Sequence, residues 1–266
     1  MSKLESKIFF RNNNLSSTNP KIENINKEGF FEGVLKIKDD EIQEICDYLK
    51  NKPMHDPENQ ELDYFYLNNR PSQIKRGFYK CEDVVLAPHV LDIANDPRIL
   101  DIASDYFGAM PSIDYIGSWW SFPSKNIALT QSYHRDIDTL NSLKFFIYLT
   151  DVDEGSGPFV YVKGSHNSDL KTKKDKMHKD NEILNSYNDE DVLEFKGKKG
   201  HNFIADTFGF HKGLAPKNSD RLILQIIYTL KRTPFGPKKP FVNFGDVEKI
   251  SKQILSHYTN RHIIRF

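Results

Sequence analysis

Two short stretches of the sequence contain side chains that can bind a metal ion. The first holds His134 and Asp136, and the second, at residues 205–228, holds His211 and Arg221. In an extended chain, residues i and i+2 point to the same side. The imidazole of His134 and the carboxylate of Asp136 can therefore hold one cation from one direction. This spacing predicts two metal ligands and requires a third from elsewhere in the chain.

A second His-x-Asp pattern, formed by His178 and Asp180, has a different setting. Five lysines lie in the same charged segment, and their charges would repel a dication. His134 instead follows a strand-like segment and precedes an apolar run at residues 143–149. Elements of this kind can hold a ligand rigidly. The sequence therefore predicts a metal at His134 and Asp136, and it predicts that His178 lies on a solvated surface segment.

Four histidines compete for the third ligand position. His201 follows a Lys-Lys-Gly run and has the position of a strand-end histidine, whereas His166 ends a Gly-Ser-His turn. His89 lies in a helical pattern, where partial burial is expected. His211 precedes a turn, and Arg221 follows it by ten residues at the start of a long apolar strand. Spacing alone leaves these alternatives open.

Two histidines and one carboxylate on one face of an octahedral metal are the usual set of non-haem Fe(II) oxygenases. The two stretches resemble the phytanoyl-CoA dioxygenase family of Fe(II)- and 2-oxoglutarate-dependent oxygenases. The resemblance rests on the His-x-Asp pair, on two apolar runs around a Gly-rich turn at residues 146–166, and on His211 followed by Arg221. It extends in element order over roughly residues 88–228.

The resemblance implies a ligand set and a reaction. His134, Asp136 and His211 would bind Fe(II), while 2-oxoglutarate and O2 would occupy the remaining positions. Arg221 would pair with the distal carboxylate of 2-oxoglutarate, because a planar guanidinium can hold a carboxylate through two hydrogen bonds. The implied activity is that of a dioxygenase that hydroxylates a small organic molecule while 2-oxoglutarate is converted to succinate and CO2.

Further pocket residues follow from strand alternation. Lys144, Phe146 and Tyr148 share one face of their strand, and the resemblance implies that this face lines the cofactor pocket. Lys144 would then bind 2-oxoglutarate or an anionic substrate, unless it is an edge-strand lysine that faces solvent. Gln131 is a candidate hydrogen-bonding residue of the pocket. The family often has a hydroxyl residue two places after the distal histidine, and here that place is Gly213.

Two other functions are compatible with the same ligands. A zinc hydrolase uses three such ligands and a water, and a jelly-roll protein can bind a metal or small molecule without oxygenase activity. A hydrolase has no evident use for Arg221, which would then be a surface charge at the start of a strand. The expected cofactors, Fe(II) and 2-oxoglutarate, distinguish the oxygenase from both alternatives.

Composition limits the partners and the cellular setting. The 37 basic and 37 acidic residues give a net charge of zero, which argues against a nucleic-acid-binding surface. Cys46 and Cys81 have neither metal-ligand spacing nor the pattern of a disulfide framework. We expect no membrane association, because no apolar run is long enough to cross a bilayer and the N-terminus has no signal-peptide core. A cytoplasmic location is therefore expected.

Periodicity predicts a mainly β fold with flanking helices, namely a double-stranded β-helix or jelly roll. We expect a flexible arm at residues 1–28 and one oxygenase domain at residues 29–266, with a charged insertion at about 168–191. Helical patterns occupy residues 41–50, 88–94, 97–107 and 246–257. Strand patterns occupy residues 113–122, 128–133, 143–149, 159–162, 192–195, 201–205 and 221–230.

Overall fold

The structure is a computed structural model, and it describes residues 19–59, 61–124, 131–136, 142–169, 177–233, 238–253 and 255–266. Its α-helices are α2 (Pro20–Glu28), α3 (Asp39–Lys50), α4 (Cys81–Val85), α5 (Val90–Ala94), α6 (Pro97–Phe107), α7 (Asp180–Leu184), α8 (Phe244–Val247) and α9 (His257–Asn260). Short 3-10 helices are η1 (Leu67–Asn69), η3 (Ser165–Asn167) and η4 (Asp189–Asp191).

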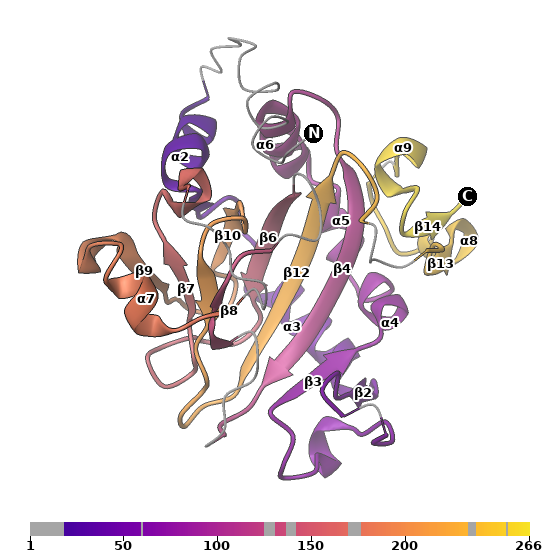
Figure 1. Cartoon of the computed structure of the whole chain (residues 1–266). Coiled ribbons are helices and arrows are strands. Elements are labelled where there is room, and N and C mark those ends of the chain that lie inside the picture. Colours follow the sequence, from indigo (N-terminus) through magenta and orange to yellow (C-terminus); the bar gives the residue numbers. More distant parts are fainter. Residues whose placement is uncertain are drawn as a thin grey trace.

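A large antiparallel sheet forms the centre of the molecule (Figure 1). Its order is β1 (Phe30–Glu32), β10 (Asn202–Ala205), β6 (Ser142–Tyr148), β12 (Arg221–Thr229), β4 (Ser112–Ser121), β3 (Arg76–Tyr79) and β2 (Met54–His55). A smaller antiparallel sheet has the order β8 (Met177–His178), β5 (Tyr133–His134), β11 (His211–Gly213), β7 (Phe159–Val162) and β9 (Val192–Phe195). Near the C-terminus, β13 (Val242–Asn243) pairs in parallel with β14 (Ile264–Arg265).

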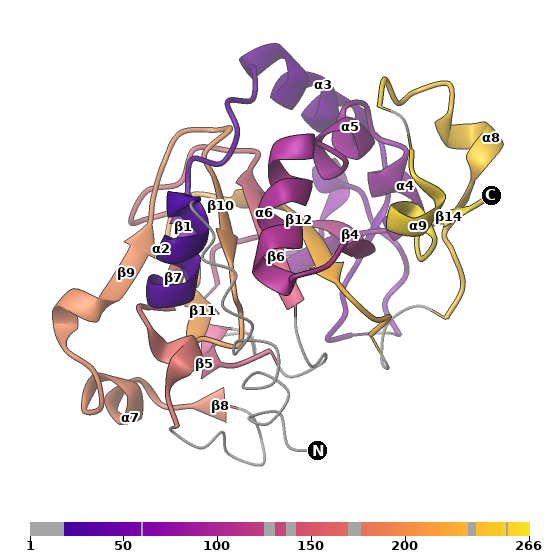
Figure 2. The same cartoon turned by 90° about the horizontal axis from the view of Figure 1, so that it is seen from above.

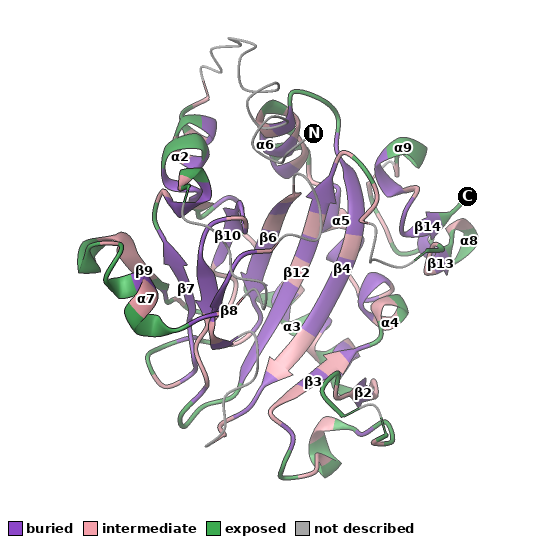
Figure 3. Cartoon of the chain, in the orientation of Figure 1, coloured by how far each residue is buried: buried purple, intermediate pink, exposed green. Residues whose placement is uncertain are grey.

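The two faces of the large sheet have different partners. Helices α3, α5 and α6 lie on one side, and β5, β7 and β11 lie on the other (Figure 2). Alternate residues of β12, such as Leu224 and Ile226, join the apolar core beneath the helices. On the opposite face, Phe146, Phe159 and Phe203 belong to a second apolar cluster between the sheets. The central strands are therefore mostly buried, whereas α7 is largely exposed (Figure 3).

These layers are those of a double-stranded β-helix, so the predicted fold class is confirmed. Strand patterns at 159–162 and 192–195 coincide with β7 and β9. Helix α6 begins and ends where its capping residues predict, since Asp96 accepts a hydrogen bond from Arg98 N and Gly108 ends the helix at φ 69°. Residues 128–130 of the predicted strand at 128–133 lie outside the described residues, and of the remaining three only Tyr133 is in a strand, at the start of β5.

The predicted flexible arm is wrong over its last part, because residues 20–28 form helix α2. Asn19 caps this helix by accepting a hydrogen bond from Lys21 N. Ile22 and Ile25 are 2% and 0% exposed and join the core beneath the helices. The burial of these two isoleucines stabilises α2, although its mostly polar sequence does not by itself indicate a helix. Residues 1–18 lie outside the described part of the chain.

The predicted helix at 246–257 is also wrong, because it is replaced by the short helices α8 and α9. The intervening chain turns toward Asp92, whose carboxylate accepts hydrogen bonds from Ser251 Oγ and Lys252 N at 2.7 Å each and from Gln253 N at 3.2 Å. These long-range bonds satisfy backbone groups that a continuous helix would have satisfied internally. The pattern at 88–94 similarly gives only α5, since His89 has φ 64°.

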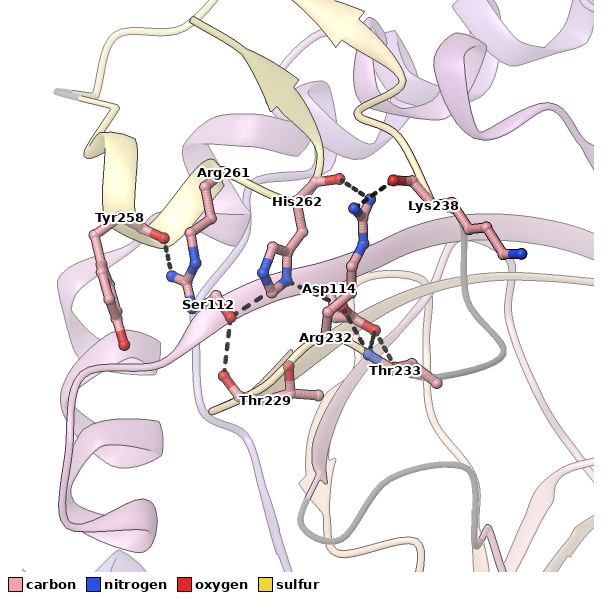
Figure 4. Close-up of polar contacts among 9 residues, drawn as sticks. All are labelled: Ser112, Asp114, Thr229, Arg232, Thr233, Lys238, Tyr258, Arg261 and His262. Carbon is pink, nitrogen blue, oxygen red and sulfur yellow. Dashed lines mark hydrogen bonds and ion pairs between the residues drawn. The ribbon is translucent and has the colours of Figure 1, made fainter.

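The C-terminal segment is attached to β4 by a buried polar cluster (Figure 4). Asp114 accepts from Thr233 N at 3.2 Å and from the Thr233 hydroxyl, and its Oδ1 lies 3.0 Å from His262 Nδ1. Arg232 donates to the carbonyls of Lys238 and His262, at 2.6 Å and 3.3 Å. Burial opposes ionisation, but His262 and Thr233 outweigh it and lower the pKa of Asp114. We call this group the C-terminal cluster.

The charged insertion is partly integrated into the small sheet. Met177 pairs with His134, and His178 pairs with Tyr133. The prediction that His178 is solvated is wrong: it is 5% exposed, and its ring packs edge-on against Phe210 at 5.0 Å between centroids. Backbone pairing with β5 outweighs the polar character of the surrounding sequence. Within the described residues, no helix has both the length and the apolar character needed to span a membrane.

Candidate active site

Two short neighbouring strands place two imidazoles side by side. His134 on β5 and His211 on β11 are direct antiparallel partners, so their side chains project from the same face of the small sheet. Their ring centroids are 4.3 Å apart. Asp136 lies two residues beyond His134, and ligand atoms of all three side chains lie within 4.8 Å of one another. The sheet register therefore brings together a three-residue set from two distant stretches.

Each imidazole is oriented by a carbonyl two residues earlier in the chain. His134 Nδ1 lies 2.9 Å from the carbonyl oxygen of Ser132, and His211 Nδ1 lies 2.9 Å from that of Gly209. A carbonyl only accepts hydrogen bonds, so Nδ1 must carry the proton in both rings. In the neutral form of each ring, Nε2 then has a lone pair directed toward the shared site. This arrangement is the usual support of a metal-binding histidine.

The carboxylate is fixed by both backbone and side-chain contacts. Asp136 N donates to the Thr207 carbonyl at 2.9 Å. Its Oδ1 lies 3.8 Å from His134 Nε2, and its Oδ2 lies 3.3 Å from His211 Nε2 and 2.5 Å from Lys144 Nζ. Burial opposes its ionisation, but Lys144 and the two imidazoles outweigh that cost. The pKa of Asp136 is therefore held well below its ordinary value.

The environment of His134 favours its neutral form, which can bind a metal. Burial, together with the neighbouring His211, lowers the pKa of His134 to about 4. A neutral imidazole with a free Nε2 is the form that binds a metal. Two imidazoles and one carboxylate fit an Fe(II) ion in donor type and number, with coordination positions left for other ligands.

Arg221 lies beside this set with much of its hydrogen-bonding capacity unused. It is 5% exposed, and its Nη2 lies 3.2 Å from the Ser121 hydroxyl. Its Nε and Nη1 are buried and have no hydrogen-bond partner in the described part of the chain. Burial lowers the pKa of Arg221, although a guanidinium stays charged in proteins. A buried cation with two open donors points to an anionic ligand.

These groups open onto one cavity of about 250 Å³ between the two sheets. The sequence candidates Gln131, Phe146 and Lys144 line it together with Arg221 and the three-residue set. The cavity also has a wall from β3 and β4, and a contribution from the middle of β12. The residues of these strands that line it are Arg76, Phe78, Tyr115, Trp119, Ser121, Ile223 and Gln225.

The competing histidines are engaged elsewhere. His201 pairs with Glu32 at 3.0 Å, and His89 pairs with Glu44 at 2.8 Å. His166 Nε2 lies 3.1 Å from the carbonyl oxygen of Asn26. Only His211 is grouped with His134 and Asp136 among the described residues. This geometry favours His211 over the other three histidines as the third ligand of a metal.

Sequence reasoning missed the wall from β3 and β4. Ser121 is the direct strand partner of both Arg221 and Arg76, and Trp119 is the partner of Phe78 with stacked rings 5.2 Å apart. The adjacent tryptophans of β4 lie on opposite faces of the sheet, because Trp119 lines the cavity and Trp120 packs against the core beneath the helices. No local signal identified Ser121, because its role depends on sheet register.

The fold and the site define a class of protein, the non-haem iron oxygenases built on a double-stranded β-helix. The family model described as phytanoyl-CoA dioxygenase (PhyH) matches residues 37–221. The chain belongs to this family, and it is an Fe(II)- and 2-oxoglutarate-dependent dioxygenase.

Similar solved structures share the fold at low sequence identity. EctD from S. alaskensis, in its apoform, has a TM-score of 0.59 and 17% identity, over 86% of this chain and 84% of that one. HygX from Streptomyces hygroscopicus, with nickel and 2-oxoglutarate bound, has a TM-score of 0.57 and 16% identity, over 83% and 87% of the two chains. No curated protein gave a significant match. These likenesses support the architecture.

Proposed function

We propose that His134, Asp136 and His211 are the Fe(II) ligands, that Arg221 binds the distal carboxylate of 2-oxoglutarate, and that the enzyme hydroxylates a small organic molecule. The observation that carries the proposal is the buried Arg221 guanidinium, which has two open donors on the cavity that the three ligands share. A zinc hydrolase would have no use for this guanidinium.

The carboxylate subsite would contain two side chains from neighbouring strands. Arg221 supplies the charge, and the Ser121 hydroxyl, 3.2 Å from Arg221 Nη2, supplies a further polar group. A Cβ atom at Gly213 would lie 3.1 Å from Arg221 Nη2. Gly213 supplies no hydroxyl beside Arg221, and we assign Ser121 the place of the hydroxyl that the family often has after the distal histidine.

The remaining chain supplies orientation and a dry environment. When bound, iron and 2-oxoglutarate supply the oxidising chemistry. Phe146 and Phe159 pack at 5.2 Å beside the ligands, and the Phe159 ring stacks on His211 at 5.4 Å. These rings exclude water from one side of the site and fix the plane of the His211 imidazole. Gln131 is 7% exposed and lines the same cavity, where we assign it a substrate- or cosubstrate-positioning role.

Succinate release from 2-oxoglutarate, measured with and without Fe(II), tests the reaction class. We expect iron-dependent release that rises when the correct substrate from a metabolite library is present. Calorimetric titration of 2-oxoglutarate into nickel-loaded protein tests cosubstrate binding separately from turnover. An absence of 2-oxoglutarate binding to the metal-loaded protein would contradict the proposal.

The product distinguishes hydroxylation from halogenation. Related halogenating enzymes lack the carboxylate ligand, which leaves a coordination place for chloride, whereas Asp136 fills that place here. We therefore expect the product to gain one oxygen atom from labelled O2 and to contain no chlorine in chloride buffer. Mass spectrometry of the product measures both, and a chlorinated product would contradict the assigned role of Asp136.

A further inference from the structure

The Lys144 ammonium has more hydrogen-bond donors than the site uses. An ammonium carries three N–H donors. One of them donates to Asp136 Oδ2 at 2.5 Å, and Lys144 Nζ has no second hydrogen-bond acceptor among the described residues. The side chain is only 11% exposed and lines the cavity. The remaining N–H groups of Lys144 are thus available to donate hydrogen bonds to a ligand in the cavity.

The formal charge of the cavity also favours an additional anionic ligand. Its charged lining residues in the described part of the chain are Arg76, Asp136, Lys144 and Arg221. Arg76 is paired with Glu58, 2.7 Å away, which also lies 3.7 Å from Lys75 outside the cavity lining. The other three residues leave one positive charge. Fe(II) would add two positive charges and 2-oxoglutarate would add two negative ones. Counting only the lining residues that the structure describes, one positive charge therefore remains in the cavity, where an unbalanced buried charge is costly.

One wall of the same cavity is aromatic and half-buried. Phe78 and Trp119 stack with an angle of 9° between their planes, and they line the cavity together with Tyr115. Exposed edges and faces of such rings bind flat apolar groups. Gln225, on β12 between the wall and Phe146, adds a neutral polar group.

We propose that Lys144 selects substrates with one anionic group, such as a carboxylate, attached to a small apolar body that packs on the Phe78–Trp119 wall. This inference rests on the proposed function, since the charge balance assumes bound iron and 2-oxoglutarate. Lys144 would contact the substrate anion while its remaining donor stays on Asp136. The lysine is thus a specificity-determining residue distinct from Arg221, which serves the cosubstrate.

A matched pair of probes tests the charge requirement. The probes are 3-phenylpropanoate and 3-phenylpropanamide, which share a phenyl body and differ in charge. Binding is measured by calorimetry to the nickel-loaded protein saturated with 2-oxoglutarate. Because hydrogen bonds to charged groups exceed neutral ones by a kcal/mol or more, we expect the acid to bind at least about tenfold more tightly than the amide.

Variants at Lys144 test whether this side chain causes the preference for the acid over the amide. In Lys144→Met the preference for the acid should vanish, whereas Lys144→Arg, which keeps the charge, should retain it. Lys198→Met is the matched control, because that side chain is 88% exposed and pairs with Asp151 on the surface. Nickel titration of each variant verifies that the metal site remains intact. A Trp120→Phe background leaves Trp119 as the single tryptophan, and quenching of its fluorescence by the acid should report occupation of the wall.

The outcomes separate this inference from the proposed function. Equal binding of acid and amide to the wild type, no binding of the acid, or a preference that persists in Lys144→Met would each overturn the role of Lys144. A persisting preference would instead indicate that the acid binds the metal. Failure of 2-oxoglutarate to bind the nickel-loaded wild type would overturn the proposed function itself.

Discussion

Two clusters in the part of the chain that the structure describes bring histidine, aspartate and arginine together, and they differ in how completely their polar atoms are hydrogen-bonded. In the C-terminal cluster, the side chain of Asp114 is 3% exposed and its oxygens meet Thr233 and His262. Arg232 there donates to two backbone carbonyls. In the active-site cavity, by contrast, Arg221 keeps two buried donors without partners among the described residues.

This difference separates an attachment site from a binding site. Partners of Asp114 come from the segment that it holds in place, so the cluster is complete without any ligand. Asp136 has the Lys144 ammonium and two imidazoles around it, all converging on one shared point beside a cavity. Buried donors without an acceptor lower the stability of a fold. Their presence in the cavity is explained if a bound ligand supplies the acceptors. The same residue types thus stabilise the fold in the C-terminal cluster and leave donors for a ligand in the active-site cavity.

The largest expected effect comes from removing one histidine from each cluster. His211→Ala should abolish succinate release and iron retention, because it removes one of three metal ligands, while the protein stays folded. His262→Ala should retain turnover but lose about 1–3 kcal/mol of unfolding free energy, because Asp114 loses a buried partner. Succinate assays, metal analysis and urea titration measure the two effects. Substantial turnover in His211→Ala would return the third ligand to His201 or His166.

A second comparison uses the two arginines. Arg221→Leu should raise the 2-oxoglutarate concentration needed for half-maximal turnover by roughly 10- to 150-fold, since charge-assisted hydrogen bonds contribute about 1.5–3 kcal/mol. Metal affinity should change far less. Arg232→Leu is the control, and its 2-oxoglutarate titration should match that of the wild type. An unchanged titration in Arg221→Leu would refute its cosubstrate role.

The third prediction concerns pH and the C-terminal cluster. The folded-state pKa of Asp114 lies below its ordinary value near 3.8. Its stabilisation is therefore fully present above about pH 4 and is lost as the pH falls through the lower folded-state value. Asp114→Asn should cost about 1–3 kcal/mol of unfolding free energy at neutral pH. The difference from the wild type should narrow in acid, as followed by urea titrations between pH 7 and about pH 3; a gap that widens in acid would contradict this sign.

The smallest expected effect tests the carboxylate subsite. Ser121→Ala should raise the 2-oxoglutarate requirement about two- to tenfold, because a neutral hydrogen bond contributes about 0.5–1.5 kcal/mol. Adding Gly213→Ser should recover part of this loss by restoring a hydroxyl beside Arg221, whose Nη2 would lie 3.1 Å from the new Cβ. If Ser121→Ala leaves the 2-oxoglutarate titration unchanged, Ser121 serves only to hold Arg221.

The sequence by itself determined the local features of this protein. The i, i+2 spacing placed His134 and Asp136 on one side, and alternation placed Lys144 and Phe146 together on the cavity face. Capping residues fixed the ends of α6 at Asp96 and Gly108. These features depend on backbone periodicity and on side-chain chemistry within a few residues, which a sequence displays directly.

Tertiary structure alone decided which strands meet. The apolar runs that became β6 and β7 flank one Gly-rich turn, yet they belong to different sheets. The imidazole of His211 lies beside that of His134 only because their two strands pair in this register. The ammonium of Lys144 contacts Asp136 only because the two sheets face each other. The physical reason is that periodicity specifies the side a residue faces, whereas strand order and register depend on packing between distant segments.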